Sequence, residues 1–264
     1  MHDLLAAMVA CARATVEQRN RHTPLARMIA DAEARQPRGG LFHERLARPG
    51  AINVIAECKR RSPARGVLCR DYDPAAVARR YASAGAAAIS VLTEPSFFDG
   101  DLAHVTRVRD AVDVPVLRKD FVVDAYQVYE ARAAGADAVL LIVAALAPDD
   151  LGALLRLANE LRLAALVEVH TADELDVAVD AGASLVGVNS RNLKTLDVDL
   201  RVCHELIVRI PPRCVAVAES GMRTVDDVRR LSRAGYRAVL IGEWLMAHAD
   251  PAGLLRELSE GAAT

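Results

Sequence analysis

Charged side chains directly follow an apolar run in the segment IAECKRRSPARG, residues 55–66. The run that leads into it, AINVIA, is typical of a buried strand, and the Ser-Pro pair ends that strand. Glu57 and Lys59 alternate with Cys58, so we expect them to share one strand face while Cys58 packs on the other. Burying unpaired charges is costly, so this strand end reaches a surface or forms a site. A carboxylate beside an ammonium group suits acid–base chemistry.

Other apolar runs also end in polar or charged residues. They are Lys119 in LRKDF, Glu168 in LVEVH, Asn189 and Arg191 in GVNSRN, Glu219 and Ser220 in AESG, and Ile241 and Gly242 in LIGEW. Two further runs, which end near Thr93 and Ile142, contribute little. Cations and carboxylates that converge on one mouth shift each other's pKa values, as proton-transfer chemistry requires. They form one site only if the fold brings these strand ends together.

Four similar segments indicate a repeated unit. They are AGAAAIS from Ala84, AGADAVL from Ala134, AGASLVG from Ala181 and AGYRAVL from Ala234. In each, glycine stands where a helical pattern ends, and an apolar stretch follows. A period of roughly 50 residues is the mark of repeated supersecondary structure.

Four more apolar runs, INVIA, PVLR, AALVEV and CVAVAE, bring the strand candidates to eight, with amphipathic segments such as DPAAVARRYASA and TVDDVRRLSRA between them. The strands are almost continuously apolar, which is typical of a parallel sheet buried on both faces. We therefore predict an α/β protein with a (β/α)8 TIM barrel over residues 49–264, in which the carboxyl ends of the strands form the active site. An open, doubly wound sheet is the alternative, but no GxGxxG turn follows a strand.

Residues 1–48 are predicted to form an N-terminal helical extension. Helical patterns cover about residues 3–20 and 24–35, and the polar linker QPRGG follows them. Apolar residues of LLAAM and PLARMIA lie on one helix face. We expect the extension to cover the barrel mouth or an adjacent face of the barrel.

Composition narrows the function classes. The formal net charge of −2 provides no electrostatic footprint for nucleic acid or an anionic membrane. No apolar run approaches the roughly 20 residues that span a bilayer, and the first residues lack the basic region of a signal peptide, so we expect a cytoplasmic protein. Five scattered cysteines without a CxxC pair argue against disulfides and against a structural zinc, and no metal site is expected.

Two glycine-containing turns favour a phosphorylated small-molecule substrate. Ser220-Gly221 follows the seventh predicted strand, and Gly242-Glu243 precedes the last helical region. These are the places where barrels of this type often bind phosphate, because glycine lets a backbone N–H approach the anion. Lys59 and Ser62 after the first strand would complete the cradle.

The strand-end motifs resemble those of the indole-3-glycerol phosphate synthase family. IAECKRRSPARG is similar to the family's first-strand signature, and AAAISVLTEPSFFDGD, VPVLRKDF, LVEVH, GVNSRNLKT, VAESGM and LIGEWLM match its later blocks in order. The resemblance covers nearly the whole chain from Ile52, and a helical N-terminal extension also suits the family.

The resemblance implies ring closure of 1-(2-carboxyphenylamino)-1-deoxyribulose 5-phosphate to indole-3-glycerol phosphate, with loss of CO2 and water. It implies Lys119 as the general acid on the ribulose carbonyl, and Glu168 and Glu57 as acid–base carboxylates, with Glu168 favoured for dehydration. Lys59 would bind the substrate's anionic groups. No cofactor is expected, because attack by the ring carbon leaves a cationic iminium that accepts the electrons of decarboxylation.

The implied site residues form two groups. The catalytic group is Glu57, Lys59, Lys119, Glu168, Asn189, Arg191 and Ser220. The substrate-binding group is Ser62, Pro63, Phe121, Leu193, Glu219, Gly221, Ile241, Gly242 and Glu243, with Phe121 and Leu193 lining the anthranilate pocket. Glu243 stands where some members have serine, and its carboxylate would repel phosphate unless it points away. We expect a monomer or weak homodimer.

Two other functions remain open at the level of sequence. The first is another phosphate-binding barrel enzyme, such as a phosphoribosyl isomerase, although that class typically uses an Asp or Cys pair. The second is a non-catalytic barrel that serves as a scaffold. A scaffold predicts loss of Lys59, Lys119 or Glu168, and all three are present.

Overall fold

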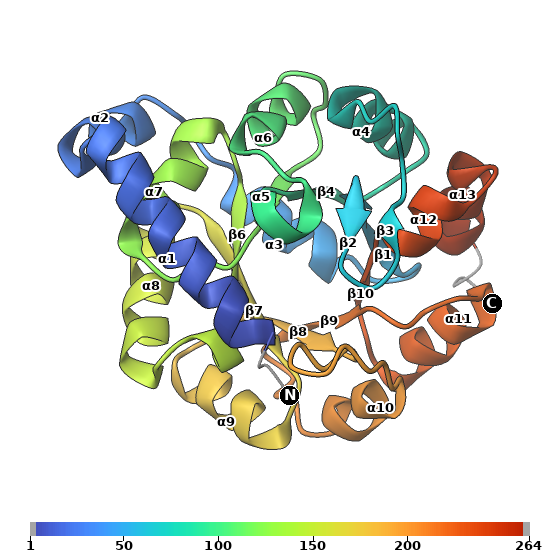
Figure 1. Ribbon diagram of the computed structural model, residues 1–264. Helices are drawn as coiled ribbons and strands as arrows, with labels where there is room; N and C mark the ends of the chain where they lie inside the picture. The colour runs from blue at the N-terminus through green and yellow to red at the C-terminus, as the bar shows by residue number, and fades with distance from the viewer. Residues whose placement is uncertain (1–3, 261–264) are drawn as a thin grey trace.

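Eight parallel strands close into a barrel in the computed structural model, which describes residues 4–260 (Figure 1). The strands are β1 Asn53–Cys58, β4 Ala88–Leu92, β5 Val116–Lys119, β6 Ala138–Ile142, β7 Ala164–Val169, β8 Leu185–Asn189, β9 Val215–Glu219 and β10 Ala238–Ile241. Neighbouring strands follow chain order, and β1 pairs with β10 to close the sheet. The predicted barrel and all eight predicted strands are confirmed, and the open-sheet alternative is wrong.

Helices surround the barrel and cover the outer face of its sheet (Figure 1). The longer ones are α4 Pro74–Ser83, α6 Leu102–Arg109, α7 Ala125–Ala134, α8 Pro148–Glu160, α9 Ala172–Asp180, α10 Arg201–Ile207, α11 Val225–Ala234 and α13 Pro251–Glu260. Short helical turns, α5 Pro95–Phe98, η1 Val143–Ala145 and α12 Glu243–Ala247, lie in loops. Side chains of Asp73, Asp101, Asp124, Thr171 and Thr224 accept hydrogen bonds from backbone N–H groups at helix starts.

Alternation along each strand divides the side chains between two cores. Cys58 faces the layer between sheet and helices, where it is fully buried, and Ile55 faces the barrel interior. Glu57 lies on the interior side and lines the mouth. On β5 the same alternation sends Arg118 outward and Lys119 inward. The interior side chains near the carboxyl ends of the strands therefore face one another.

The N-terminal extension contains three helices: α1 Leu4–His22, α2 Leu25–Glu33 and α3 Gly39–Ala47. The prediction of two helices and a polar linker was wrong for the last part, because the two glycines of QPRGG begin α3. Phe42 and Leu46, one helical turn apart, are fully buried in the core of the barrel interior, and this burial stabilises a segment of weak helical signal.

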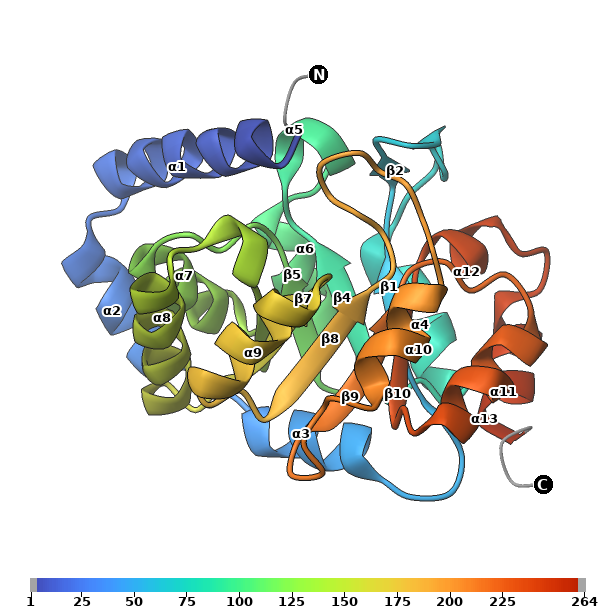
Figure 2. The ribbon, with the colours of Figure 1, turned by 90° about the horizontal axis from the view of Figure 1, so that it is seen from below.

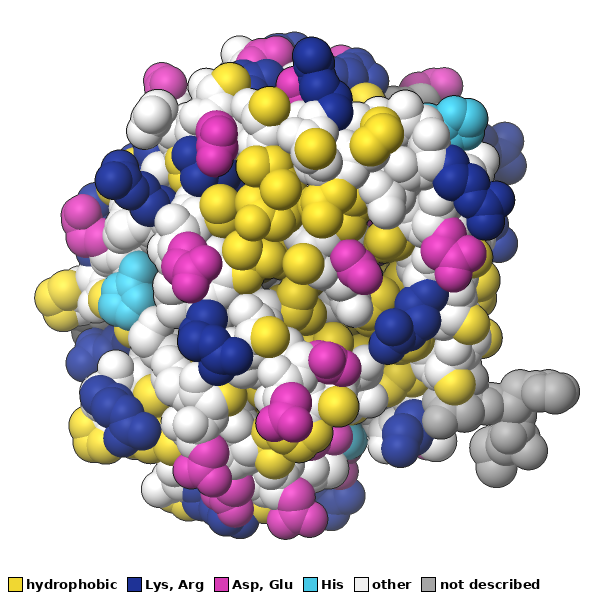
Figure 3. Space-filling view, turned by 90° about the vertical axis from the view of Figure 1, so that its left-hand side faces the viewer, with side chains coloured by type: hydrophobic (Ala, Val, Ile, Leu, Met, Phe, Trp, Pro, Cys, Tyr) yellow, Lys and Arg dark blue, Asp and Glu magenta, His cyan; other side chains and the backbone are white. Residues whose placement is uncertain are grey.

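The extension covers both ends of the barrel. Figure 2 shows α1 at the end where the strand-end loops gather and α3 at the opposite end. Met8 of α1 lines the pocket at the mouth, as the sequence prediction of a mouth cover requires. On the face of the molecule that includes α2, Lys and Arg are interspersed with Asp and Glu, around a central group of hydrophobic side chains (Figure 3).

One small element was not predicted. After β1 the chain forms a hairpin of β2 Arg61–Ser62 and β3 Gly66–Val67, so Ser62 ends β2 and Pro63 begins the turn, and both residues line the apolar side of the mouth. Across residues 4–260, every helix is too short or too polar to cross a membrane.

Candidate active site

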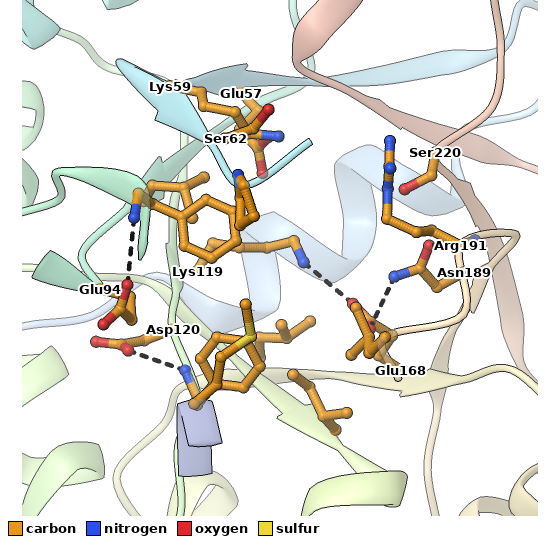
Figure 4. A pocket seen from close by; sticks show the side chains of 18 of the residues that line it. Glu57, Lys59, Ser62, Glu94, Lys119, Asp120, Glu168, Asn189, Arg191 and Ser220 are labelled. Atoms are coloured by element: carbon orange, nitrogen blue, oxygen red, sulfur yellow. Dashed lines mark hydrogen bonds and ion pairs between the residues drawn. The ribbon is translucent and has the colours of Figure 1, made fainter. Parts of the chain in front are cut away.

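Among the pockets at the carboxyl ends of the strands, two adjoin each other and share lining residues. The first, here called the apolar pocket, has a volume of about 690 Å³ (Figure 4). Its lining includes Met8, Leu92, Phe98, Phe121, Leu140, Ile142 and Leu193. The second, here called the polar pocket, extends over the loops that follow β9 and β10 and is lined by Arg65, Gly221, Arg223, Ile241 and Gly242, among others. Glu57, Lys59, Lys119, Arg191, Ser220 and Glu243 line both pockets.

All sixteen residues predicted for the site line one or both of these pockets. Those that line only the apolar pocket are Ser62, Pro63, Phe121, Glu168, Asn189 and Leu193. Those that line only the polar pocket are Glu219, Gly221, Ile241 and Gly242. The structure thus brings together the residues that the sequence analysis selected for one site. Their individual roles stay predictions.

Lys119 occupies the centre of the charged cluster. Its ammonium Nζ lies 3.0 Å from Glu168 Oε2 and 3.5 Å from Glu219 Oε2. Figure 4 shows it extended toward Glu168. Burial would lower the pKa of Lys119, but the carboxylates of Glu168, Glu219 and Glu57 outweigh it and raise that pKa above its ordinary value. Lys119 is therefore a cation that can donate a hydrogen bond or a proton.

Glu168 is held from two sides. Asn189 Nδ2 donates a hydrogen bond of 2.9 Å to Glu168 Oε1, and Lys119 pairs with the other oxygen. The side chain of Glu168 is only 3% exposed, so these contacts fix its orientation in place of water. A carboxylate held in this way is a suitable acid–base group beside a bound substrate.

Glu219 is a buried carboxyl with an altered pKa. Burial raises its pKa, Lys119 opposes that effect, and the neighbouring Glu168 adds to it, so the pKa reaches about 8. Its Oε1 atom lacks a hydrogen-bond partner within the described part of the chain and lies against Gly187, where a Cβ atom would collide with it. Glu219 therefore keeps its proton to a higher pH than an ordinary carboxyl group does, beside the Lys119–Glu168 pair.

Glu57 and Lys59 form a second pair on the opposite side of the mouth. Lys59 Nζ contacts Glu57 Oε1 at 2.5 Å, and Glu57 is almost fully buried. The carboxylate lies against Gly242, and any side chain at that position would displace it.

Arg191 and Glu243 pair where the two pockets meet. Arg191 Nη2 lies 3.5 Å from Glu243 Oε1, and Arg191 Nη1 donates to the carbonyl of Leu196. The side chain of Glu243 therefore reaches toward a cation, while its backbone N–H stays at the start of α12.

The turn after β9 has an unusual backbone conformation. Ser220 has φ 63° and Gly221 has φ 81°, so two successive residues adopt the left-handed conformation. Such a conformation is strained for serine and is retained where neighbouring structure requires it, often at ligand sites. A Cβ atom at Gly221 would also meet Ser190 Oγ at 2.7 Å. Ser220 and Gly221 both line the polar pocket, where a turn of this kind can present backbone N–H groups to an anion.

Several lining residues were missed from the sequence. They include Met8, Ala64, Arg65, Leu92, Glu94, Phe98, Asp120, Leu140, Leu196 and Arg223, with Ile142 considered but not chosen. The sequence did not identify Glu94 as a lining residue. Its carboxylate caps the short helix α5 and accepts hydrogen bonds from the backbone N–H groups of Ser96, Phe97 and Phe98. A period-two reading of β4 and β6 would have found the inward-facing Leu92 and Leu140.

The comparisons with known proteins agree with this geometry. The sequence profile described as indole-3-glycerol phosphate synthase matches residues 5–258. The indole-3-glycerol phosphate synthase of Chromobacterium violaceum is 46% identical over 260 residues, which cover 98% of both chains. That of Nocardioides sp. is 52% identical over 253 residues, which cover 96% of both chains.

A solved structure with low sequence identity confirms the architecture alone. The 3-hexulose-6-phosphate synthase of Salmonella typhimurium matches with a TM-score of 0.65 over 79% of this chain and 97% of its own, at 14% identity. The matches over the whole chain favour neither the isomerase nor the scaffold alternative. Family profile, full-length relatives and strand-end geometry lead to one conclusion: the chain belongs to the indole-3-glycerol phosphate synthase family.

Proposed function

We propose that the protein converts 1-(2-carboxyphenylamino)-1-deoxyribulose 5-phosphate to indole-3-glycerol phosphate, with release of CO2 and water, in tryptophan biosynthesis. This reaction makes it a carbon–carbon lyase. The observation that carries the proposal is the position of Lys119, paired with Glu168 and Glu219, in the wall shared by the two pockets. The substrate has an aromatic ring at one end and a phosphate at the other, and its reacting carbonyl lies between them.

The two pockets suit the two ends of the substrate. The anthranilate ring would lie in the apolar pocket against Phe121 and Leu193. The phosphate would enter the polar pocket, where the backbone N–H groups of Gly221 and Gly242 would donate to it. Lys59 lines both pockets and would bind the substrate's anionic groups. Ser62, Pro63 and Ser220 would complete the polar contacts.

Ring closure is proposed to depend on Lys119. The ring carbon that bears the carboxylate attacks the ribulose carbonyl, and its oxygen gains negative charge in the transition state. The Lys119 ammonium would donate its proton to that oxygen, while Asn189 and Arg191 orient the polar chain. Because the Lys119 side chain is largely buried, a fixed cation there stabilises the developing charge more strongly than it would in solution.

Decarboxylation and dehydration complete the reaction. Loss of CO2 returns the electron pair of the broken bond to the iminium and restores the aromatic ring. The hydroxyl formed by ring closure then leaves as water, and the neighbouring carbon loses a proton. Glu168 is proposed to act in this dehydration, with Glu57 as the second acid–base carboxylate. The substrate's own nitrogen supplies the electron sink.

The test is direct conversion of the substrate by the purified protein, followed through the fluorescence of the indole product. We expect turnover by wild-type protein and loss of most turnover in Lys119→Met. Absence of indole formation by a folded wild-type protein would reject the function. The expected cytoplasmic location and the monomeric or weakly dimeric state stay predictions, and size-exclusion chromatography tests the latter.

A further inference from the structure

A fully buried arginine lies directly behind the proposed catalytic lysine. Arg118 precedes Lys119 on β5, points away from the barrel interior and has 0% exposure. Its guanidinium contacts Asp120 Oδ2 at 2.9 Å and Glu130 Oε2 at 2.8 Å. It also donates to the hydroxyl of Thr93 and the carbonyl of Gln127. A buried guanidinium with all these contacts holds the neighbouring backbone in one arrangement.

Toward the outside, this cluster continues into the N-terminal extension. Glu130 belongs to α7 and is 2% exposed, and its Oε2 atom also accepts a hydrogen bond of 2.9 Å from Arg19 Nη1. Arg19 lies near the end of α1, the helix whose other end carries Met8 into the apolar pocket. Tyr126 of α7 adds a hydrogen bond from its hydroxyl to the carbonyl of Thr23. The position of α1 therefore affects the Glu130 carboxylate, which in turn contacts Arg118.

Toward the inside, the cluster reaches the wall of the apolar pocket. Asp120 lines that pocket, accepts a 2.6 Å hydrogen bond from Thr93 Oγ1 and accepts another from the backbone N–H of Phe121. The backbone N–H of Thr93 in turn donates to the carbonyl of Lys119. These bonds orient the backbone on both sides of Asp120, and with it the Lys119 ammonium and the Phe121 ring.

We propose that the alternating series Arg19–Glu130–Arg118–Asp120, here called the ion chain, is a positioning device that places Lys119 and Phe121 according to how α1 is docked. Two cations, Arg19 and Arg118, share Glu130. Loss of Arg19 therefore changes the electrostatic attraction between Glu130 and Arg118, and with it the contact between Arg118 and Asp120. Buried charges respond strongly to a missing partner because the surroundings screen them weakly. Arg118, Glu130 and Arg19 touch no substrate in this scheme; they act through Lys119 and Phe121. This inference rests on the proposed function.

The ion chain is tested at its outer end, where substitution leaves no buried charge without a partner. In Arg19→Met, Glu130 keeps its ion pair with Arg118, so the protein is expected to fold. We expect kcat at saturating substrate, measured well below the melting temperature, to fall about fivefold. Arg19→Lys should return kcat to within about twofold of wild type, because it restores the charge. Arg13→Met, at an exposed position of the same helix, is the matched control and should leave kcat unchanged.

A second variant distinguishes an effect of Arg19 that acts through the ion chain from an effect that only holds α1 on the barrel. Glu130→Gln removes the shared charge, and adding Arg19→Met to it should lower kcat no further. The proposal is overturned if Arg19→Met lowers only the melting temperature while kcat equals that of wild type, or if the losses in the double variant multiply. Failure of the wild type to form the indole product would instead reject the proposed function, so the two failures are distinguishable.

Discussion

Lys119 is surrounded by more negative than positive charge, and this imbalance determines what it can do. Glu168, Glu219 and Glu57 together raise its pKa, so the ammonium persists across the physiological range. A lysine in this state is a poor base and a strong hydrogen-bond donor. This agrees with protonation of a carbonyl oxygen as it becomes an alkoxide, and it argues against Lys119 as the group that removes protons.

The first prediction is that Lys119→Met lowers kcat by roughly 10² to 10⁴, with KM altered only a few-fold, because the interaction is made in the transition state. Methionine keeps much of the length and apolar bulk, so the melting curve should stay close to that of wild type. Steady-state kinetics measure the effect. Lys194→Met, at an exposed lysine, is the control and should be fully active. A kcat within about tenfold of wild type would end the candidacy of Lys119.

The second prediction concerns the pH dependence of stability. Glu219 has its pKa raised from 4.5 to about 8 in the folded protein. Between these values the folded state binds more protons than the unfolded chain, so the free energy of unfolding falls as pH rises through this window. In Glu219→Gln, which cannot ionise, this part of the fall should disappear. Melting temperatures at pH 5 to about 8.5 for both proteins measure it, and parallel curves would contradict the raised pKa.

At the level of elements, α1 and α3 pack at different places on the barrel although they are close in sequence. The helix α3 buries Phe42 and Leu46 in the core of the barrel interior, whereas α1 places Met8 in the apolar pocket. Between them, Arg38 donates its backbone N–H to Asp137 and pairs with the same carboxylate. A truncation that removes only the mouth cover should therefore end before Arg38.

The third prediction is that a protein lacking residues 1–37 keeps a cooperatively folding barrel but binds substrate more weakly. Loss of Met8 opens the apolar pocket to water. The free energy of burying one apolar side chain of this size corresponds to a rise of about tenfold or more in KM. The same variant loses Arg19, so kcat should also fall. Calorimetry establishes folding, and steady-state kinetics establish the change in KM. An unchanged KM would show that α1 does not contribute to the substrate site.

At the level of the whole molecule, the two pockets adjoin each other and share a charged wall. A ligand that fills both pockets touches loops from β1, β5, β8, β9 and β10, and it stabilises the closed barrel by mass action. A ligand that fills only the polar pocket touches fewer of these loops.

The fourth prediction follows from this difference. Indole-3-glycerol phosphate at about 100 times its dissociation constant should add about 2.7 kcal/mol to the free energy of unfolding. For a chain of this size, that raises the melting temperature by about 5 °C or more. Inorganic phosphate at the same concentration is the control and should produce a smaller shift, because it fills only the polar pocket. Equal shifts would contradict a ligand site that spans both pockets.

The sequence alone determined the barrel and the composition of its mouth. Eight apolar runs separated by amphipathic segments have few alternatives to a parallel barrel, and in that fold the carboxyl ends of all strands meet at one rim. Residues such as Glu57, Lys119 and Glu168 could therefore be assigned to one site without coordinates. Strand alternation also requires the neighbouring residues Arg118 and Lys119 to point to opposite faces of the sheet.

Only the tertiary structure decided the features that depend on contacts between distant segments. GGLFHERLA has a weak helical signal, and α3 forms because Phe42 and Leu46 are buried inside the barrel. The raised pKa of Glu219 arises from burial and from charges on other strands. The ion chain joins Arg19 to Glu130 across 111 residues of sequence. Local patterns describe neighbours along the chain, whereas burial and ion pairing depend on neighbours in space, and only the folded chain supplies those.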